Sequence, residues 1–231
     1  MLTLGIETAT HAVGVGLGDE AGLIGRTEVL RGRRHAETLV PAIEALLART
    51  ERTHADITAV AVDVGPGLFT GLRVGVAAAK AFALALGVPV VTATSLEILA
   101  HEVAVGGLWE GRVAAIVDAR RKEVYAQLFD VSSAGAVPCG DPWVGPASDV
   151  AERIRGGGRV LGVGDGVARH PDVFSSMPGL QCLAPASPSV AALLGLASLR
   201  SAVSAVSAVS ADEVELVYLR APDAEINWVK R

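Results

Sequence analysis

Residues Gly65–Gly75 read GPGLFTGLRVG, a glycine-rich turn between an apolar run and a long alanine-rich stretch. The preceding run, ITAVAVDV at Ile57–Val64, has the length and the β-branched content of a buried strand. The stretch after the turn favours a helix over Leu72–Leu86, which Gly87 is placed to end. A strand, a glycine turn and a helix in this order predict an α/β fold.

The glycine turn does not match the known phosphate-binding loops. It lacks the Gly-Lys-Ser/Thr of a P-loop, and its third glycine comes one residue too late for the dinucleotide fingerprint. Pro66 followed by Gly67 suits a type II turn with a positive φ at the glycine, and Thr70 is placed to cap the helix. Two roles stay open: a tight turn with close packing, which the ordinary behaviour of glycine and proline favours, and anion binding at the helix N-terminus.

The alternation of strands and helices continues on both sides of this unit. Upstream, the pattern predicts a hairpin over Leu2–Ile6 and Ala12–Leu17, a strand over Leu23–Leu30 and an amphipathic helix over Ala36–Arg49. Downstream, Val88–Thr92 is predicted to be a strand.

A second round of the pattern begins near Arg112. RVAAIVDAR and EVYAQLFDV predict two strands joined by a charged turn, VLGVGDG predicts a strand that ends in glycines, and SPSVAALLGLASL predicts a helix. Two successive α/β units that each open with a hairpin indicate a duplicated architecture, with one domain over 1–104 and another over 105–231. The repeat SAVSAVSAVS at Ser201–Ser210 is predicted to be a low-complexity surface insertion or an extension of the helix before it.

Composition limits the classes of protein. Of the 231 residues, 51% are hydrophobic and 19% are charged, which excludes a disordered chain. The net charge of −5 argues against unaided binding to nucleic acid. The N-terminus lacks the basic region of a signal peptide, and the apolar stretch from Ala81 is interrupted by Gly87 and Pro89. The sequence therefore predicts a cytoplasmic protein with no membrane association.

Short catalytic motifs are absent from the sequence. None of the five histidines pairs with another at i,i+4, and neither HExxH nor GxSxG occurs. Glu7, Asp63 and Asp118 lie at strand ends, where α/β folds place ligand groups. Glu7 and Asp118 form the one pair with a shared predicted location, because each lies where a hairpin opens, one in each half. A nucleotide-dependent enzyme would need such carboxylates for its metal and water.

Six segments together resemble one protein family. They are LGIETAT, RHAETLVPAI, GPGLFTGLRVG, GVPVVTATSLEILA, DARRKEVYA and YLRAPDA. In these segments the chain is similar to the bacterial TsaB family, also called YeaZ, which is related to the glycoprotease M22-like proteins. The resemblance covers most of the N-terminal half and is weaker in the middle of the C-terminal half. It implies an actin-like fold, of the sugar kinase/Hsp70/actin (ASKHA) type, with two related lobes.

The resemblance also implies a function. It is that of a non-catalytic scaffold or activating subunit in the assembly that forms threonylcarbamoyladenosine at adenosine 37 of tRNAs. The implied partners are a TsaD-like catalytic subunit, which carries the metal and the nucleotide, and a TsaE-like ATPase. In isolation the chain is expected to form a homodimer, to reach tRNA only through the complex and to have no cofactor of its own.

The first two helices are the pairing surface that the resemblance implies. In this sequence they are the helix after His35 and the helix after Gly71. The expected contact residues are His35, Leu39, Ile43, Leu46, Phe69, Leu72, Arg73, Val76, Ala79 and Phe82. Small residues at Gly71, Gly75, Ala78 and Ala79 are expected to let a partner helix approach closely.

The sequence departs from the catalytic relative at the metal site. TsaD-type proteins carry two histidines at i,i+4, and here Ser95 and Leu99 occupy those positions, with His101 two residues out of register. Glu7 stands where actin-like ATPases begin with an aspartate, and its longer side chain would crowd a phosphate-bound Mg²⁺. A vestigial nucleotide cleft would comprise Glu7, Thr8, Gly65, Asp118, Arg120 and Gly164.

Two other functions stay open. A stand-alone actin-like ATPase or kinase is suggested by the two glycine turns and by the pair of Glu7 and Asp118. A metallopeptidase is suggested by fold analogy and the older family name alone.

Overall fold

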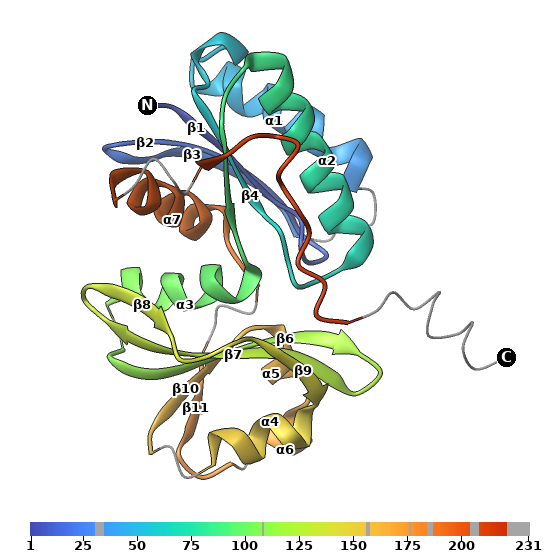
Figure 1. The fold of residues 1–231 in the computed structure, drawn as a ribbon, viewed down its shortest axis with the longest axis vertical. Helices are drawn as coiled ribbons and strands as arrows, with labels where there is room; N and C mark the ends of the chain where they lie inside the picture. The colour runs from blue at the N-terminus through green and yellow to red at the C-terminus, as the bar shows by residue number, and fades with distance from the viewer. Residues whose placement is uncertain are drawn as a thin grey trace, which may run out of the picture.

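The computed structural model describes residues 1–30, 35–107, 109–155, 158–175, 177–183, 187–203 and 208–220. These residues form two lobes, each built on one sheet (Figure 1). Two helices, α3 (Ser95–Gly106) and α7 (Val190–Val203), lie between the two sheets and contact each other.

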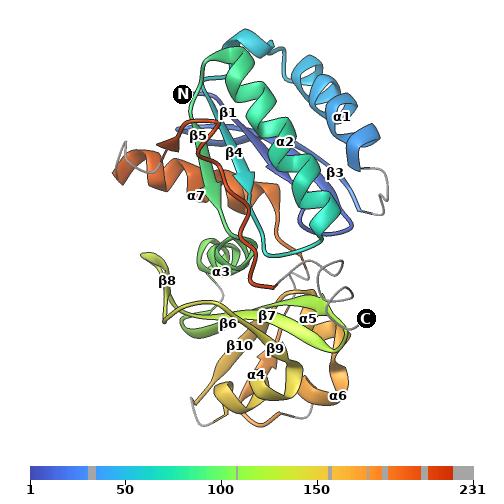
Figure 2. The ribbon, with the colours of Figure 1, turned by 45° about the vertical axis from the view of Figure 1, so that its right-hand side comes forward.

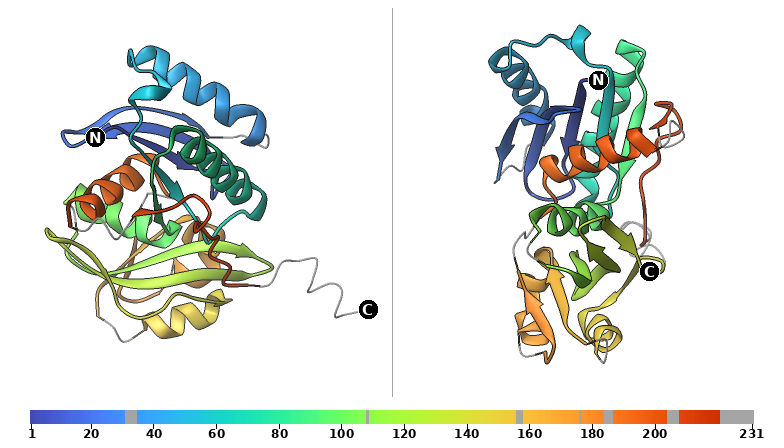
Figure 3. Two further views of the ribbon diagram at one scale, coloured as in Figure 1. Left: turned by 45° about the horizontal axis from the view of Figure 1, so that its top comes forward. Right: turned by 90° about the vertical axis from the view of Figure 1, so that its left-hand side faces the viewer.

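The first lobe has a sheet of strand order β3-β2-β1-β4-β5, with the short β12 added beside β5. Its strands are β1 (Thr3–Glu7), β2 (Val13–Asp19), β3 (Gly22–Val29), β4 (Ala59–Asp63), β5 (Val90–Ala93) and β12 (Ala208–Val209). The first three strands are antiparallel, whereas β4 and β5 run parallel to β1. α1 (His35–Arg49) and α2 (Phe69–Leu86) cover one face, and α7 covers the other (Figure 3). A single 3-10 turn over His54–Asp56 precedes β4.

Successive residues of β1 and β2 point to opposite faces of the sheet, so alternate residues face α1 and α2 on one side and α7 on the other. Leu4 and Ile6 are fully buried in the core that includes residues of α1 and α2. Gly5 and Gly16 point to the opposite face, where a Cβ on Gly5 would lie 2.9 Å from the Val190 side chain. The glycines on this face allow α7 to lie directly on the sheet.

The second lobe repeats the strand order as β8-β7-β6-β10-β11. Its strands are β6 (Gly111–Arg120), β7 (Glu123–Ser132), β8 (Gly135–Pro138), β10 (Val160–Val163) and β11 (Leu180–Cys182), and β9 (Trp143–Pro146) pairs with the start of β7. Again the first three strands are antiparallel and the last two run parallel to the first. α3 covers one face, and the shorter helices α4 (Ala147–Ile154), α5 (Asp165–Arg169) and α6 (Pro171–Phe174) lie on the other side.

The repeated strand order confirms the duplicated α/β architecture and the actin-like class of fold. The division of the chain differs from the predicted one at residue 104. α3 packs on the second sheet, and the chain returns to the first lobe with α7 and β12. The second lobe therefore lies within the chain, and the first lobe contains residues from both of its ends.

Several local predictions can be compared with the structure. Gly87 ends α2 with φ 68°, as predicted. The turn before α2 differs: the positive φ is at Gly65 (98°), the Gly65–Pro66 peptide is cis, and the residue before the helix is Leu68, with no side-chain cap from Thr70. In the serine-alanine-valine repeat, α7 extends to Val203 and Ala208–Val209 form β12, while residues 204–207 lie outside the described residues.

Candidate functional site

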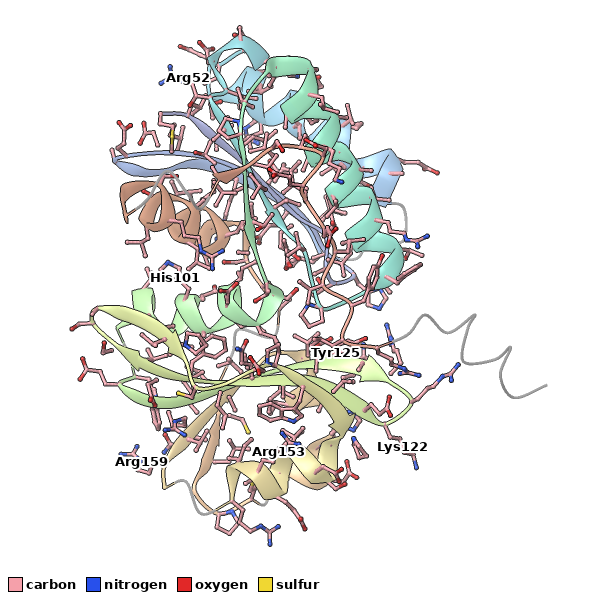
Figure 4. The ribbon with its side chains drawn as sticks, viewed as in Figure 1. Arg52, His101, Lys122, Tyr125, Arg153 and Arg159 are labelled. Atoms are coloured by element: carbon pink, nitrogen blue, oxygen red, sulfur yellow. The ribbon has the colours of Figure 1, made fainter. Side chains whose placement is uncertain are left out.

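A cleft of about 850 Å³ lies where the two lobes meet. Segments of both lobes line it, among them the turn after β1, the glycine turn with the start of α2, the end of β6 with Tyr125 of β7, Asp165, and the tail after β12. Figure 4 shows Tyr125 between the lobes and Lys122 at the tip of the β6–β7 hairpin. The cleft is thus the meeting point of segments that are far apart in the sequence.

Three of the quoted motifs meet at this cleft. Phe69, from GPGLFTGLRVG, has its ring centroid 5.7 Å from that of Tyr218, in YLRAPDA. The Arg73 guanidinium lies 3.9 Å above the Phe69 ring. Arg220 donates to the Ala119 carbonyl at 3.0 Å and forms an ion pair with Glu123 at 3.0 Å, both in DARRKEVYA. The motifs therefore form one contact network that joins the two lobes.

Asp118 and Arg120 line the cleft, and each is engaged with neighbours. Arg120 lies 3.6 Å from Asp118 and 2.9 Å from His11 Nε2, across the cleft. Asp165 accepts a hydrogen bond from the Asp118 amide at 2.9 Å, and His170 lies 3.8 Å from the Asp118 carboxylate. Burial raises the pKa of Asp165. Arg120 and His170 thus lie beside the Asp118 carboxylate in the second lobe, and Arg120 also reaches His11 across the cleft.

Glu7 does not reach the cleft. Its side chain is buried in the first lobe beside Asp63, with exposures of 1% and 0%. Glu7 accepts a hydrogen bond from the Ala9 amide at 2.7 Å, while Asp63 accepts bonds from the Gly65 amide at 2.7 Å and from the Ser95 hydroxyl at 2.8 Å. The predicted pairing of Glu7 with Asp118 is therefore wrong, because the two carboxyl groups lie in different environments.

The burial and proximity of Glu7 and Asp63 favour the protonated forms of these carboxyl groups. Burial, followed by the nearby Asp63, raises the pKa of Glu7 well above its usual range. Burial also raises the pKa of Asp63 to about 7. Two adjacent carboxyl groups in a dry site cannot both ionise cheaply, so the site disfavours the doubly charged pair. A buried acid whose pKa is raised in this way is a poor ligand for a metal ion.

The other residues assigned to a nucleotide cleft have packing roles. Thr8 and Gly65 are buried and do not line the cleft. A Cβ on Gly164 would lie 2.1 Å from the Ile116 carbonyl oxygen, so this glycine allows β10 to turn against β6. Of the six predicted cleft residues, the structure brings together Asp118 and Arg120.

The glycines of the opening motif have the same purpose in the first lobe. A Cβ on Gly71 would lie 2.1 Å from the Thr8 carbonyl oxygen, and one on Gly75 would lie 2.1 Å from the Thr8 hydroxyl. Close packing is therefore the role of this turn, and it is packing of α2 against the end of β1. The expectation that these glycines admit a partner helix is wrong, since this chain already fills the space.

The ten predicted pairing residues divide by burial. Seven are buried in the first lobe: His35, Leu39, Ile43, Leu46, Leu72, Val76 and Ala79. These side chains are unavailable to a partner, so the prediction chose the inward faces of the helices at these positions. Phe69 and Phe82 are half-buried and Arg73 is exposed, and for these three residues the predicted contact stays a prediction.

Residues that sequence reasoning missed form the outward face of α2. Leu84 is 71% exposed, and Ala77, Ala81 and Ala85 are exposed beside it on the same helix. On the neighbouring α1, Val40 is 47% exposed. The spacing 77-81-84-85 could have indicated this face, but α2 is apolar on both sides and periodicity alone did not say which side faces the sheet.

The apolar composition of α2 is also compatible with a membrane-spanning helix. Within the described ranges, it is the helix whose length and composition would allow it to cross a membrane, although 33% of it is buried in this fold. Core helices of soluble proteins meet the same criterion.

The positions that correspond to the metal ligands of the catalytic relative do not fit a metal. Ser95 donates to Asp63, and Leu99 is fully buried among apolar side chains. His101 is buried where α3 meets α7 (Figure 4), and a Cβ on Gly195 would lie 2.8 Å from its Nε2. In the part of the chain that the structure describes, no three His, Cys, Asp or Glu residues form a cluster that could hold a metal ion.

Comparison with known proteins gives consistent matches. The family TsaD, described as tRNA N6-adenosine threonylcarbamoyltransferase, matches residues 29–159, more than half of the chain. The chain is 38% identical over 225 residues to the protein Rv3421c of Mycobacterium tuberculosis, covering 96% of this chain and 93% of that protein.

Two further matches carry a more specific name. The tRNA threonylcarbamoyladenosine biosynthesis protein TsaB of Bacillus subtilis is 33% identical over 129 residues, which cover 56% of this chain and 55% of that protein. Among solved structures, YeaZ from Pseudomonas aeruginosa is similar with a TM-score of 0.83 and 29% identity, covering 94% of this chain and 99% of that one.

Proposed function

The chain belongs to the TsaB (YeaZ) family, and on that premise we propose that it is a non-catalytic scaffold and activating subunit in threonylcarbamoyladenosine biosynthesis. Its proposed partners are a TsaD-like catalytic subunit and a TsaE-like ATPase, with a homodimer in the absence of the TsaD-like subunit. The modification would be made on adenosine 37 of tRNAs, which the chain would reach only within this complex. The proposed setting is the cytoplasm.

The observation that carries the proposal is the outward face of α2, defined by Ala77, Ala81, Leu84 and Ala85. An exposed apolar surface with small side chains allows a second helix to approach closely and to bury the apolar area. Full burial of Leu84 alone would contribute about 1.5–3 kcal/mol. A surface of this kind suits lasting association with another protein.

The environment of the carboxyl groups supports a non-catalytic role. Glu7 is buried with Asp63, which raises its pKa well above the usual range, and Asp118 is engaged by Arg120. Ser95 and Leu99 occupy the positions of the metal-binding histidines of the catalytic relative. We propose that this chain has no cofactor of its own and that ATP and metal are held by the partner subunits.

The deciding experiment mixes this chain with its TsaD-like partner. Titration of the chain should raise tRNA modification by the partner and the ATPase, and the two proteins should co-purify at micromolar concentration. Ala81→Glu should weaken this association at least tenfold, because a carboxylate would be buried without a counterion. Ala134→Glu, on the exposed β7–β8 turn of the second lobe, is the matched control and should bind like wild type.

Two results would contradict parts of the proposal. No complex at micromolar concentration would contradict the proposed pairing. Equal binding by Ala81→Glu and Ala134→Glu would keep the pairing but remove α2 from the interface.

The cleft favours a second candidate, a stand-alone ATPase or kinase. It has the size of a small-molecule site, and Asp118 and Asp165 lie at its wall. Turnover of ATP by the purified chain, abolished by Asp118→Asn, would support this alternative. Undetectable binding of Mg-ATP by calorimetry would dispose of it.

A further inference from the structure

The segment after β12 crosses from one lobe to the other. β12 pairs with β5 at the edge of the first sheet, and Ala211 and Val214 are buried in the core of the first lobe. The segment then descends towards the second lobe, as the red ribbon in Figure 2 shows. Its last described residues, including Val217, Tyr218 and Arg220, line the cleft.

On the first-lobe side, the segment holds the glycine turn. The Val217 amide donates to the Val64 carbonyl at 2.9 Å, directly before this turn. Tyr218 then packs against Phe69, the first residue of α2, whose other contact is the Arg73 guanidinium. The first turn of α2 has no side-chain cap, so these contacts are well placed to order it.

On the second-lobe side, Arg220 makes the connection. Arg220 is 14% exposed and reaches the Ala119 carbonyl and the Glu123 carboxylate, one on each side of the β6–β7 turn. In this turn, Arg120, Arg121 and Lys122 all have positive φ values. Non-glycine residues rarely adopt this conformation, so a turn of this kind depends on surrounding contacts.

We propose that Ala211–Arg220 is an interlobe strap, which holds the lobes together across the cleft and orders the first turn of α2 and the β6–β7 turn. In two-lobed proteins that close around a ligand, the ligand supplies the contacts that join the lobes. Here the chain's own Arg220 supplies such a contact. Release of the strap would open the cleft and loosen the start of α2 together.

The strap links the cleft to the pairing helix. A partner that changes the first turn of α2 would also change the contacts of Tyr218 and, through the strap, those of Arg220. This consequence rests on the proposed function, whereas the strap itself does not. The test therefore uses the isolated full-length chain.

Hydrogen exchange measured by mass spectrometry tests the strap. Arg220→Ala should speed exchange roughly three- to tenfold in two separate regions, Ala119–Val124 and Val64–Val76, because a partly buried charged hydrogen bond is lost. Exchange in β1, β4 and α4 should stay as in wild type. Arg155→Ala, an exposed arginine at the end of α4, is the matched control and should change neither region.

A second pair of variants isolates the ring contact. Tyr218→Ala should loosen Val64–Val76, whereas Tyr218→Phe, which keeps the ring, should not. Glu123→Gln should reproduce part of the Arg220→Ala effect and add nothing to it in the double variant, since both changes break one ion pair.

Three results would overturn the strap. One is faster exchange confined to residues 211–220 in Arg220→Ala, and another is unchanged exchange throughout. The third is a uniform rise over the whole chain in both Arg220→Ala and Tyr218→Ala, which would indicate a general contribution to stability. None of these outcomes depends on whether a TsaD-like partner binds.

Discussion

The two lobes share one strand order but differ at the end of the first strand of each sheet. In the first lobe Glu7 is buried beside Asp63, and burial raises its pKa well above the usual range. In the second lobe Asp118 lies at the cleft beside Arg120 and His170. Sheet topology thus brings a carboxyl group to a given place, whereas the chemistry of that group depends on what packs around it.

The helices after the fourth strand of each sheet differ in the same way. α2 has 18 residues and an outward apolar face, while α5 has 5 residues. Yet both lobes use a glycine against the carbonyl oxygen of a residue in or directly after the first strand: Gly71 against Thr8, and Gly164 against Ile116. The duplicated lobes thus kept the packing device and diverged in the surface that the following helix offers.

The largest expected effect concerns this packing device. Gly71→Ala should lower the free energy of unfolding by about 3 kcal/mol, because the new Cβ would meet a backbone oxygen that cannot move aside. Gly106→Ala at the end of α3 is the control, since its Cβ would meet open space. Denaturant unfolding measures both, and equal stability of the two variants would contradict the close approach of α2 to β1.

The next effect concerns the sealed carboxyl pair. Glu7 and Asp63 have raised pKa values in the folded state, so the folded protein binds more protons than the unfolded chain above about pH 4. Stability should therefore fall as pH rises from about 4 towards 7 and beyond, by up to about 1.4 kcal/mol per pH unit for each group.

Two variants, one in each lobe, test this dependence of stability on pH. Glu7→Gln should flatten the decline in stability between pH 4 and pH 7, because it removes one titrating group. Asp165→Asn in the second lobe should flatten it less, since Asp165 is less deeply buried and its pKa is raised less sharply. Unfolding curves measured across this pH range would contradict the raised pKa of Glu7 if Glu7→Gln left the slope unchanged.

The smallest expected effect compares two cation–π contacts. Arg73 lies 3.9 Å from the Phe69 ring in the first lobe, and Arg153 lies 4.9 Å from the Trp143 ring in the second. Replacing either arginine by alanine should cost about 0.5–1 kcal/mol of stability. Arg73→Ala should in addition weaken pairing, and Arg153→Ala should not. Thermal unfolding measures the loss of stability in each variant, and a binding titration measures the loss of pairing. Equal loss of binding by Arg73→Ala and Arg153→Ala would contradict a role for the first-lobe contact in pairing.

Much of the fold was predictable because its elements follow from local sequence patterns. The apolar run before Gly65, the glycine turn and the alanine-rich helix follow from strand length and helical propensity, and the second hairpin repeats the first. The return of α7 to the first lobe was not predictable, because an apolar helix packs equally well on either sheet. Burial of Leu72 and Val76 and exposure of Leu84 were likewise undecided, since both sides of α2 are apolar.

The two α/β units, the family and the absence of a histidine pair where the catalytic relative has one could all be read from the residues alone. These depend on residue type and spacing along the chain. Three contacts become known only from the folded chain: Glu7 lies beside Asp63 instead of Asp118, Gly71 and Gly75 pack against Thr8, and Arg220 reaches the β6–β7 turn. Such contacts join residues distant in sequence, and the desolvation or steric space that defines them exists only once the lobes are packed.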